Sequence, residues 1–313
     1  MNANTKLMYL MAVVMGILVV ASIIGAILHT RVRSEGGRAV VLNLNARIRA
    51  WWGMIAIFAV AFWVGPIATL VRVAFVSCFA LREFVTLTPT RPGDHRALAV
   101  AFFIMIPLQY YTIGIAYYSL FSLMIPVYGF LLLPSLSTLT QDTQHFLERS
   151  AKIQWAVMIT IYCISSAPAL LMLKIPDYEG QSALLLFYLL LIVQLSDVMQ
   201  YVVGKLFGKT KLAPVISPSK TVEGLIGGGL IAVAVGTSLW WITPFSPLAA
   251  AGMSAAIVAA GALGGLVLSA VKRSLGAKDW GTMIEGHGGT LDRMDSVSFA
   301  APVFFHLVRY FYT

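Results

Sequence analysis

The chain has 313 residues, of which 59% are hydrophobic and only 11% are charged, and its mean hydropathy is +0.84. Because soluble globular domains carry about 25% charged residues, this composition excludes an ordinary soluble protein and predicts an all-α, polytopic bundle of membrane helices. The formal net charge of +9 is typical of loops that face anionic lipid headgroups, so we expect no nucleic acid partner.

Long apolar runs mark the predicted membrane spans, because a helix of about 20 apolar residues crosses the hydrocarbon core of a bilayer. The first run, Met8–His29, is longer than the core of a signal peptide, and we expect it to be retained as an anchor. Trp51–Leu81 is interrupted by Gly65-Pro66 and predicts two short helices, and Ala97–Leu139 predicts a hairpin of two. Single spans are expected at Ile153–Leu173, Ser182–Val203, Leu225–Thr243, Leu248–Ala270 and Val297–Tyr312. The total is about ten spans, or about eight or nine if the paired runs cross once.

The loops between these spans differ in charge. Basic residues gather in residues 31–49, 82–96, 141–152, 204–224 and 272–296. A chain of about ten spans puts all of these loops on one side, and the positive-inside rule assigns that side to the cytoplasm. We therefore expect a multi-pass protein of the cell membrane whose functional loops face the cytoplasm. Residues 1–181 form an N-terminal transmembrane region, and residues 182–313 form a C-terminal transmembrane region that carries the motifs.

The first motif-bearing segment begins at Asp197, a carboxylate within a predicted span. A charge is costly there, so we favour a functional role over a helix cap or an interhelical hydrogen bond. The run Ser217-Pro218-Ser219-Lys220 then places two hydroxyls and a lysine beside a rigid turn, ahead of a glycine-rich helix start. Such an arrangement can bind phosphate.

The second motif-bearing segment, Ser269–Ser296, concentrates ionisable residues between two apolar runs. They are Lys272, Arg273, Lys278, Asp279, Glu285, His287, Asp292, Arg293 and Asp295. Lysine and arginine bind phosphates, aspartate binds a hard cation that also contacts phosphate, and the Gly288-Gly289 pair lets backbone N–H groups approach an oxyanion. The segment indicates phosphoryl or nucleotidyl chemistry at a membrane surface.

The same residues resemble the signature of a known enzyme family. Ser269, Lys272-Arg273, Lys278-Asp279, His287-Gly288-Gly289, Asp292-Arg293 and Asp295 are similar to the signature of the phosphatidate cytidylyltransferases, also called CDP-diacylglycerol synthases. Leu206–Gly224 resembles the family's other recurrent loop, whereas the first half of the chain matches only in being hydrophobic. The resemblance implies a magnesium-dependent membrane enzyme of phospholipid biosynthesis, which converts CTP and phosphatidic acid into CDP-diacylglycerol and pyrophosphate.

The resemblance and the side-chain chemistry together suggest a role for each candidate residue. The expected catalytic residues are Lys272, Arg273, Asp292 and Arg293. The expected substrate-binding residues are Ser217, Ser219, Lys220, Ser269, Lys278, His287, Gly288 and Gly289. The expected Mg²⁺ ligands are Asp292, Asp295 and Asp197. CTP and phosphatidic acid are the expected partners, and the pattern leaves a homodimer open.

The chain departs from the family pattern in ways that indicate a diverged member. Gly265 stands where the family has an acidic residue, so the first expected metal carboxylate is missing. Ser274 stands where an aspartate commonly follows the Lys-Arg pair. Trp280 and Glu285 replace a small residue and a proline in the loop before His287. The metal site is therefore the part of the family pattern from which this chain departs most.

Three other functions fit parts of the sequence. A CTP-dependent lipid kinase would use similar basic loops and carboxylates, but it would release CDP where a cytidylyltransferase releases pyrophosphate. A transporter or lipid-binding membrane protein would show flux of its substrate without consuming nucleotide. A catalytically weakened relative would bind CTP or lipid and regulate a partner. The glycine at position 265, where the family has a metal carboxylate, is compatible with this third function.

Overall fold

The computed structural model describes residues 3–32, 65–281 and 288–313, together with positions 37–38, 41–42, 45, 48–49 and 52. The chain divides into two compact units, Met1–Thr69 and Leu70–Thr313. The predicted division into regions 1–181 and 182–313 stays a prediction. Two expected features, the first half of the Trp51–Leu81 pair and His287, lie outside the described residues.

The first unit is built on α1 (Ala3–Arg31), a single helix that contains the expected Met8–His29 span. Within this unit, the side-chain amide of Asn45 donates to the Gly25 carbonyl at 3.3 Å, and the Trp52 indole N–H donates to Ser22 Oγ at 3.1 Å. Gly25 and Ser22 on α1 therefore accept hydrogen bonds from two residues further along the chain, Asn45 and Trp52.

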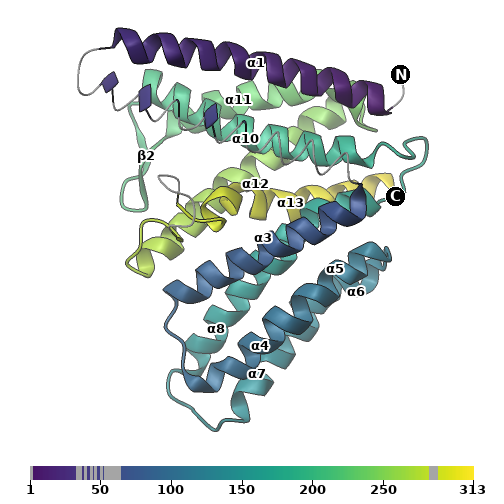
Figure 1. Ribbon diagram of the computed structural model, residues 1–313, viewed down its shortest axis with the longest axis vertical. Helices are drawn as coiled ribbons and strands as arrows, with labels where there is room; N and C mark the ends of the chain where they lie inside the picture. The colour runs from purple at the N-terminus through teal and green to yellow at the C-terminus, as the bar shows by residue number, and fades with distance from the viewer. Residues whose placement is uncertain are drawn as a thin grey trace. The chain divides into compact units, whose positions relative to one another are not determined.

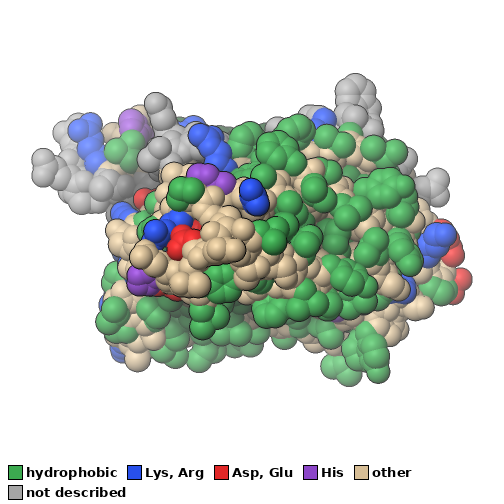
Figure 2. Space-filling model, turned by 90° about the horizontal axis from the view of Figure 1, so that it is seen from below, with side chains coloured by type: hydrophobic (Ala, Val, Ile, Leu, Met, Phe, Trp, Pro, Cys, Tyr) green, Lys and Arg blue, Asp and Glu red, His purple; other side chains and the backbone are tan. Residues whose placement is uncertain are grey.

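Six helices in the described part of the chain are long and apolar enough to cross a membrane. They are Met8–Arg31, Pro92–Gly114, Tyr118–Thr138, Phe146–Met172, Ser182–Phe207 and Pro247–Ser274. Figure 2 shows a face on which apolar side chains cover most of the middle, while acidic side chains lie near its two ends. The prediction of an all-α, polytopic membrane protein is confirmed.

The N-terminal part of the second unit is a set of long helical rods interrupted by π-helical turns. After α3 (Pro66–Leu87), it comprises η1 (Pro92–Asp94), α4 (His95–Val100), η2 (Ala101–Met105), α5 (Ile106–Gly114), α6 (Tyr118–Leu123), η3 (Met124–Gly129), α7 (Phe130–Thr138), α8 (Phe146–Val157), η4 (Met158–Cys163), α9 (Ile164–Ala169) and η5 (Leu170–Met172). The chain reverses between α5 and α6 at Ala116, whose φ is +54°. The predicted hairpin within Ala97–Leu139 is confirmed, and Figure 1 shows its two rods side by side.

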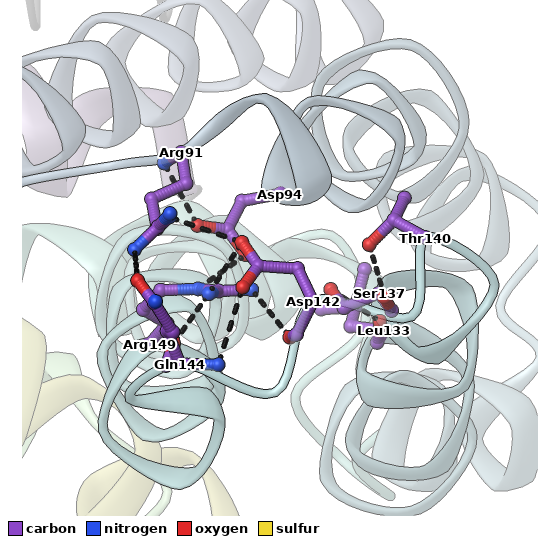
Figure 3. A network of polar contacts seen from close by, with 8 residues as sticks. All are labelled: Arg91, Asp94, Leu133, Ser137, Thr140, Asp142, Gln144 and Arg149. Carbon is purple, nitrogen blue, oxygen red and sulfur yellow. Dashed lines mark hydrogen bonds and ion pairs between the residues drawn. The ribbon is translucent and has the colours of Figure 1, made fainter.

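An ion-pair network with a buried centre joins the ends of these rods (Figure 3). Arg149 on α8 donates from Nε to Asp94 Oδ1 at 3.1 Å and from Nη1 to Asp142 Oδ2 at 3.0 Å. Arg91 reaches the same Asp142 oxygen at 3.0 Å. The Arg149 and Asp94 side chains are both buried, so each requires the other as a counterion. These residues lie in predicted polar loops, and the network among them was not predicted.

The C-terminal part of the unit carries both motif-bearing segments. It contains α10 (Ser182–Phe207), β1 (Lys211–Ala213), β2 (Ser217–Thr221), α11 (Val222–Ser238), η6 (Trp240–Ile242), α12 (Pro247–Ser274) and α13 (Leu291–Tyr312). The strands form an antiparallel hairpin in which Lys211 pairs with Thr221 and Ala213 pairs with Ser217. The sequence analysis expected a loop here, so the hairpin is a local addition to an otherwise helical fold.

Glycines allow α10 and α11 to pack backbone against backbone. A Cβ atom on Gly224 would lie 2.6 Å from the carbonyl oxygen of Gln200, and one on Gly228 would lie 2.5 Å from the Cα of Gln200. Real Cβ atoms do not approach other atoms so closely, so both positions need glycine. Small residues of this kind are how membrane helices gain close van der Waals contact without a hydrophobic driving force between them.

Gly228→Ala is expected to lower the free energy of unfolding by about 1–3 kcal/mol, because the added methyl must push rigid backbone apart. Thermal unfolding of the purified protein in detergent measures the effect. Gly252→Ala on α12 is the matched control, since a Cβ there meets no atom within 4 Å. Equal unfolding temperatures for the two variants would show that α10 and α11 are not in backbone contact at Gly228.

Candidate active site

A buried ion pair lies between the end of α12 and the start of α13. Lys272, in the last turn of α12, donates from Nζ to Asp292 Oδ1 at 2.6 Å, and each side chain is only 10% exposed. Asp292 lies in the first turn of α13. A cation at a helix C-terminus and an anion at a helix N-terminus are both favoured by the helix dipole. The pair therefore brings together two residues that the sequence analysis assigned to catalysis.

The second oxygen of Asp292 contacts described residues on both sides of positions 282–287, between the two helices. Oδ2 accepts hydrogen bonds from the backbone N–H groups of Trp280 at 2.8 Å and Gly289 at 2.9 Å. Gly288 has a φ of +77°, and a Cβ atom there would lie 2.7 Å from Asp292 Oδ2. The predicted Gly288-Gly289 pair thus allows the backbone to approach an anion, and in this structure that anion is the Asp292 carboxylate.

Lys220 reaches the same region from the β-hairpin. Its Nζ atom lies 2.8 Å from the position of a Cβ on Gly265, and Ser296 Oγ lies 3.5 Å from that position. Because Gly265 has no side chain, a space remains beside its Cα, and the Lys220 ammonium lies next to that space. Ser269, one turn further along α12, donates its hydroxyl to the Gly265 carbonyl at 2.6 Å. A carboxylate at position 265 would meet Lys220 directly.

The base of the hairpin is fixed by hydrogen bonds of Thr221 and Glu223, which follow Lys220 in the chain. Thr221 Oγ1 accepts from the backbone N–H of Gly224 at 3.1 Å and caps the start of α11. Hydrogen bonds from its own backbone N–H, and from those of Lys209 and Thr210, lower the pKa of Glu223 to about 2. Glu223 is therefore ionised at neutral pH and ties the start of β1 to α11.

Asp295 belongs to the same charged cluster. Burial raises the pKa of its carboxyl above the usual range, while the Ser296 backbone N–H and the ammonium groups of Lys272 and Lys220 act in the opposite direction. Asp292 is close enough to add to the upward shift. The cluster thus combines two ammonium groups with two carboxylates. A bound anion or cation would change the electrostatic interactions among all four groups.

The other predicted site residues differ in exposure and in their contacts. Arg273 and Lys278 are exposed, and Arg273 Nη1 donates to the Ala277 carbonyl at 3.2 Å. Ser219 is exposed, whereas Ser217 and Arg293 are half-buried. Asp197 is half-buried on α10, beside the turn that packs on Gly228. His287 lies outside the described residues, so its predicted contact with substrate stays a prediction.

The donor set for the predicted Mg²⁺ ion is small. Within residues 65–281 and 288–313, no three acidic, histidine or cysteine side chains come close enough to hold a metal ion. Asp292 and Asp295 lie three residues apart on α13, which puts them on neighbouring positions of one helix surface. One or two carboxylates suffice when substrate phosphates complete the coordination of Mg²⁺, so these residues fit an ion that arrives with a nucleotide.

Two residues that were assigned no role from the sequence, Glu83 and Trp280, contact each other's segments beside the cluster. Glu83 on α3 is buried, and its two carboxylate oxygens accept from the backbone N–H groups of Thr290 at 2.7 Å and Leu291 at 2.8 Å. Trp280 stacks on Phe84 with 4.9 Å between the ring centroids, and its indole nitrogen has no hydrogen-bond partner among the described residues. The departure of Trp280 from the family pattern was the one visible sign that the loop contacts an additional element.

Comparison with known proteins finds a matching family and a relative of nearly equal length. A profile described as the Cytidylyltransferase family matches residues 45–311. The "Uncharacterized protein YnbB" of Escherichia coli (strain K12) is 37% identical over 306 residues, which cover 96% of this chain and 97% of the relative.

Two staphylococcal relatives match a shorter stretch. The "Phosphatidate cytidylyltransferase" of Staphylococcus aureus (strain COL) is 38% identical over 157 residues, which cover 49% of this chain and 60% of the relative. The protein of the same name from Staphylococcus haemolyticus (strain JCSC1435) is 42% identical over 120 residues, which cover 38% of this chain and 46% of the relative. The matched stretch thus spans less than two thirds of each staphylococcal protein.

Proposed function

Because the chain belongs to the cytidylyltransferase family, we propose that it is a phosphatidate cytidylyltransferase, which joins CTP and phosphatidic acid into CDP-diacylglycerol and releases pyrophosphate. The observation that carries the proposal is the cluster of Lys220, Lys272, Asp292 and Asp295. These residues come from both motif-bearing segments and meet between the hairpin and the α12–α13 junction.

The proposed reaction asks the protein for alignment and charge neutralisation. A phosphate oxygen of phosphatidic acid is already anionic, so it can attack the α-phosphorus of CTP without a strong base. A new P–O bond forms there, and the bond from the α-phosphorus to the bridging oxygen of the β-phosphate breaks, so pyrophosphate leaves with the electron pair. The enzyme must bring two polyanions together and stabilise the leaving group.

The cluster supplies groups suited to these tasks. Lys272 and Lys220 would contact phosphate oxygens, and the exposed Arg273 and half-buried Arg293 would neutralise charge around them. The hydroxyls of Ser217 and Ser219 would donate further hydrogen bonds, and Ser269, whose hydroxyl donates to the Gly265 carbonyl, would accept one. Mg²⁺, when bound through Asp292 and Asp295, would offset the negative charge of the triphosphate.

The protein is a multi-pass membrane protein, and we place the proposed site at the cytoplasmic surface of the cell membrane. The basic loops, which the positive-inside rule assigns to the cytoplasm, include the segments that carry Lys220 and Lys272. A site at this boundary would let soluble CTP meet a lipid headgroup whose acyl chains stay in the bilayer.

A product assay tests the proposal. Full-length protein in detergent, supplied with CTP and Mg²⁺, is expected to release pyrophosphate when phosphatidic acid is added and to form CDP-diacylglycerol in equal amount. Diacylglycerol is the matched acceptor, because it presents a hydroxyl in place of the phosphate. Release of CDP with diacylglycerol, and no pyrophosphate with phosphatidic acid, would identify a lipid kinase and overturn the proposal.

One observation favours a second candidate, a relative that binds CTP or phosphatidic acid without turnover. The expected carboxylate at position 265 is missing, and the Lys220 ammonium lies beside the space it would fill. A site with fewer carboxylates binds Mg²⁺ less tightly. Saturable binding of CTP by the purified protein, combined with no pyrophosphate release over a wide range of Mg²⁺ concentrations, would favour this candidate.

A further inference from the structure

Glu83 connects the N-terminal half of the chain to the candidate active site. It lies near the end of α3, more than two hundred residues from the start of α13, and its side chain is buried. Its carboxylate oxygens accept from the N–H groups of Thr290 and Leu291 at 2.7 and 2.8 Å. The first N–H groups of a helix have no partner within the helix, so an anion at this place satisfies them and interacts favourably with the helix dipole.

The surroundings of Glu83 are shaped to admit its carboxylate. A Cβ atom on Gly289 would lie 2.5 Å from Glu83 Oε2, and one on Gly281 would lie 3.2 Å from Glu83 Oε1. The next residue of α3, Phe84, stacks on Trp280. Two glycines and one aromatic ring of the α12–α13 loop thus contact two consecutive residues of α3.

Glu83 and Asp292 bind consecutive N–H groups of the backbone that leads into α13. Asp292 accepts from the N–H groups of Gly289 and, twelve residues before itself, Trp280, and Glu83 accepts from those of Thr290 and Leu291. The three bonds to Gly289, Thr290 and Leu291 fix the backbone immediately before Asp292 from two directions. We infer that Glu83 is the positioning residue that holds Asp292 in register with Lys272, an inference that, for its effect on turnover, rests on the proposed function.

The charge and the length of the side chain both contribute to this role. A glutamine at position 83 has one acceptor oxygen and one NH₂ group, and the NH₂ group would face a backbone N–H that also needs an acceptor. An aspartate keeps the charge but is shorter by one methylene. Glu83→Gln is therefore expected to perturb the segment strongly, and Glu83→Asp to perturb it less.

The test compares Glu83→Gln and Glu83→Asp with wild-type protein and with Glu148→Gln, an exposed glutamate on α8 that serves as the matched control. For Glu83→Gln we expect kcat per folded molecule to fall by about 10²-fold, because a small displacement of a site group has that effect, with the KM for CTP changed little. Glu83→Asp should recover part of the loss, and Glu148→Gln should behave as wild type. A purely structural role would reduce the folded fraction and leave kcat per folded molecule unchanged.

Hydrogen exchange gives a readout that does not need turnover. In Glu83→Gln, and to a smaller degree in Glu83→Asp, the amides of Thr290 and Leu291 should exchange faster, while those within α8 should not change. If these amides exchange faster in the Glu83 variants while the wild-type protein itself proves inactive, the positioning role is supported and the proposed function is not. Unchanged exchange, or wild-type kcat in either folded variant, would overturn the inference whether or not the proposed function holds.

Discussion

Asp292→Asn is expected to reduce pyrophosphate release by roughly 10²–10³-fold, the range found when one pre-organised group is removed from a charged transition-state site. Asp292 accepts from the Lys272 ammonium and from two backbone N–H groups, so it sets both the charge and the shape of the cluster. Asparagine keeps one acceptor oxygen but places an NH₂ group against a lysine or a backbone N–H.

The same substitution also leaves a buried lysine without its counterion, which costs about 3–5 kcal/mol in stability. Thermal unfolding in detergent must therefore accompany the activity measurement. The double variant Lys272→Met, Asp292→Leu removes both charges and is expected to unfold at a higher temperature than Asp292→Asn while remaining inactive. A folded Asp292→Asn protein with near-normal turnover would remove Asp292 from the active site.

Arg149→Met is expected to lower the free energy of unfolding by about 3–5 kcal/mol, because it leaves the buried Asp94 carboxylate without a charged partner. Figure 3 shows the Arg149 side chain between Asp94 and Asp142, with Gln144 beside it. The guanidinium also donates to the carbonyl of Gln144 at 2.5 Å, so the loop before α8 loses several contacts together. Chemical or thermal unfolding in detergent measures the loss.

The matched control is Lys152→Met on the same helix. Lys152 pairs with Glu148 at the surface, and an exposed pair of this kind contributes about 0–1 kcal/mol. Because Arg149 has no part in the proposed chemistry, the kcat of the folded Arg149→Met protein should match that of wild type. Equal stability losses for the two variants would show that the Arg149 network is solvated and not buried.

The helices were predictable because the bilayer imposes their length and composition. The apolar run Ala97–Leu139 is too long for one span, and the structure turns at Ala116 as a hairpin requires. The sequence placed Lys272 and Asp292 in one site, since both lie in one short motif between two helices, but it did not predict that they pair with each other. What the sequence could not supply was the role of Asp292 as an acceptor for two backbone N–H groups.

The features that sequence reasoning missed all depend on contacts between distant segments. Glu83 and Arg149 look like ordinary residues at loop boundaries, and only folding brings Glu83 to the start of α13 and Arg149 to Asp94. The β-hairpin was missed because prolines and serines suggest a loop, whereas its short strands are held by pairing and by Glu223. A local sequence pattern does not show which distant residue a side chain will contact.

Gly265 shows how a departure from a family pattern gains meaning from structure. In the sequence it is only a missing carboxylate, which suggests a weaker metal site. In the structure the Lys220 ammonium lies 2.8 Å from where a side chain would begin, so the glycine gives a cation access to the cluster. The two descriptions are compatible, because a lysine can offset phosphate charge without a metal ligand at position 265.

The most direct test of cytidylyl transfer at the Lys272–Asp292 cluster follows the phosphorus atoms of CTP. Wild-type protein and Asp292→Asn are incubated in detergent with phosphatidic acid, Mg²⁺ and CTP that carries a radioactive label on either the α- or the γ-phosphate. We expect wild type to transfer the α-label to a lipid-soluble product and to release the γ-label as pyrophosphate, and Asp292→Asn to do neither at a comparable rate. Transfer of the γ-label to lipid, or an α-label that stays water-soluble with wild-type protein, would contradict the account.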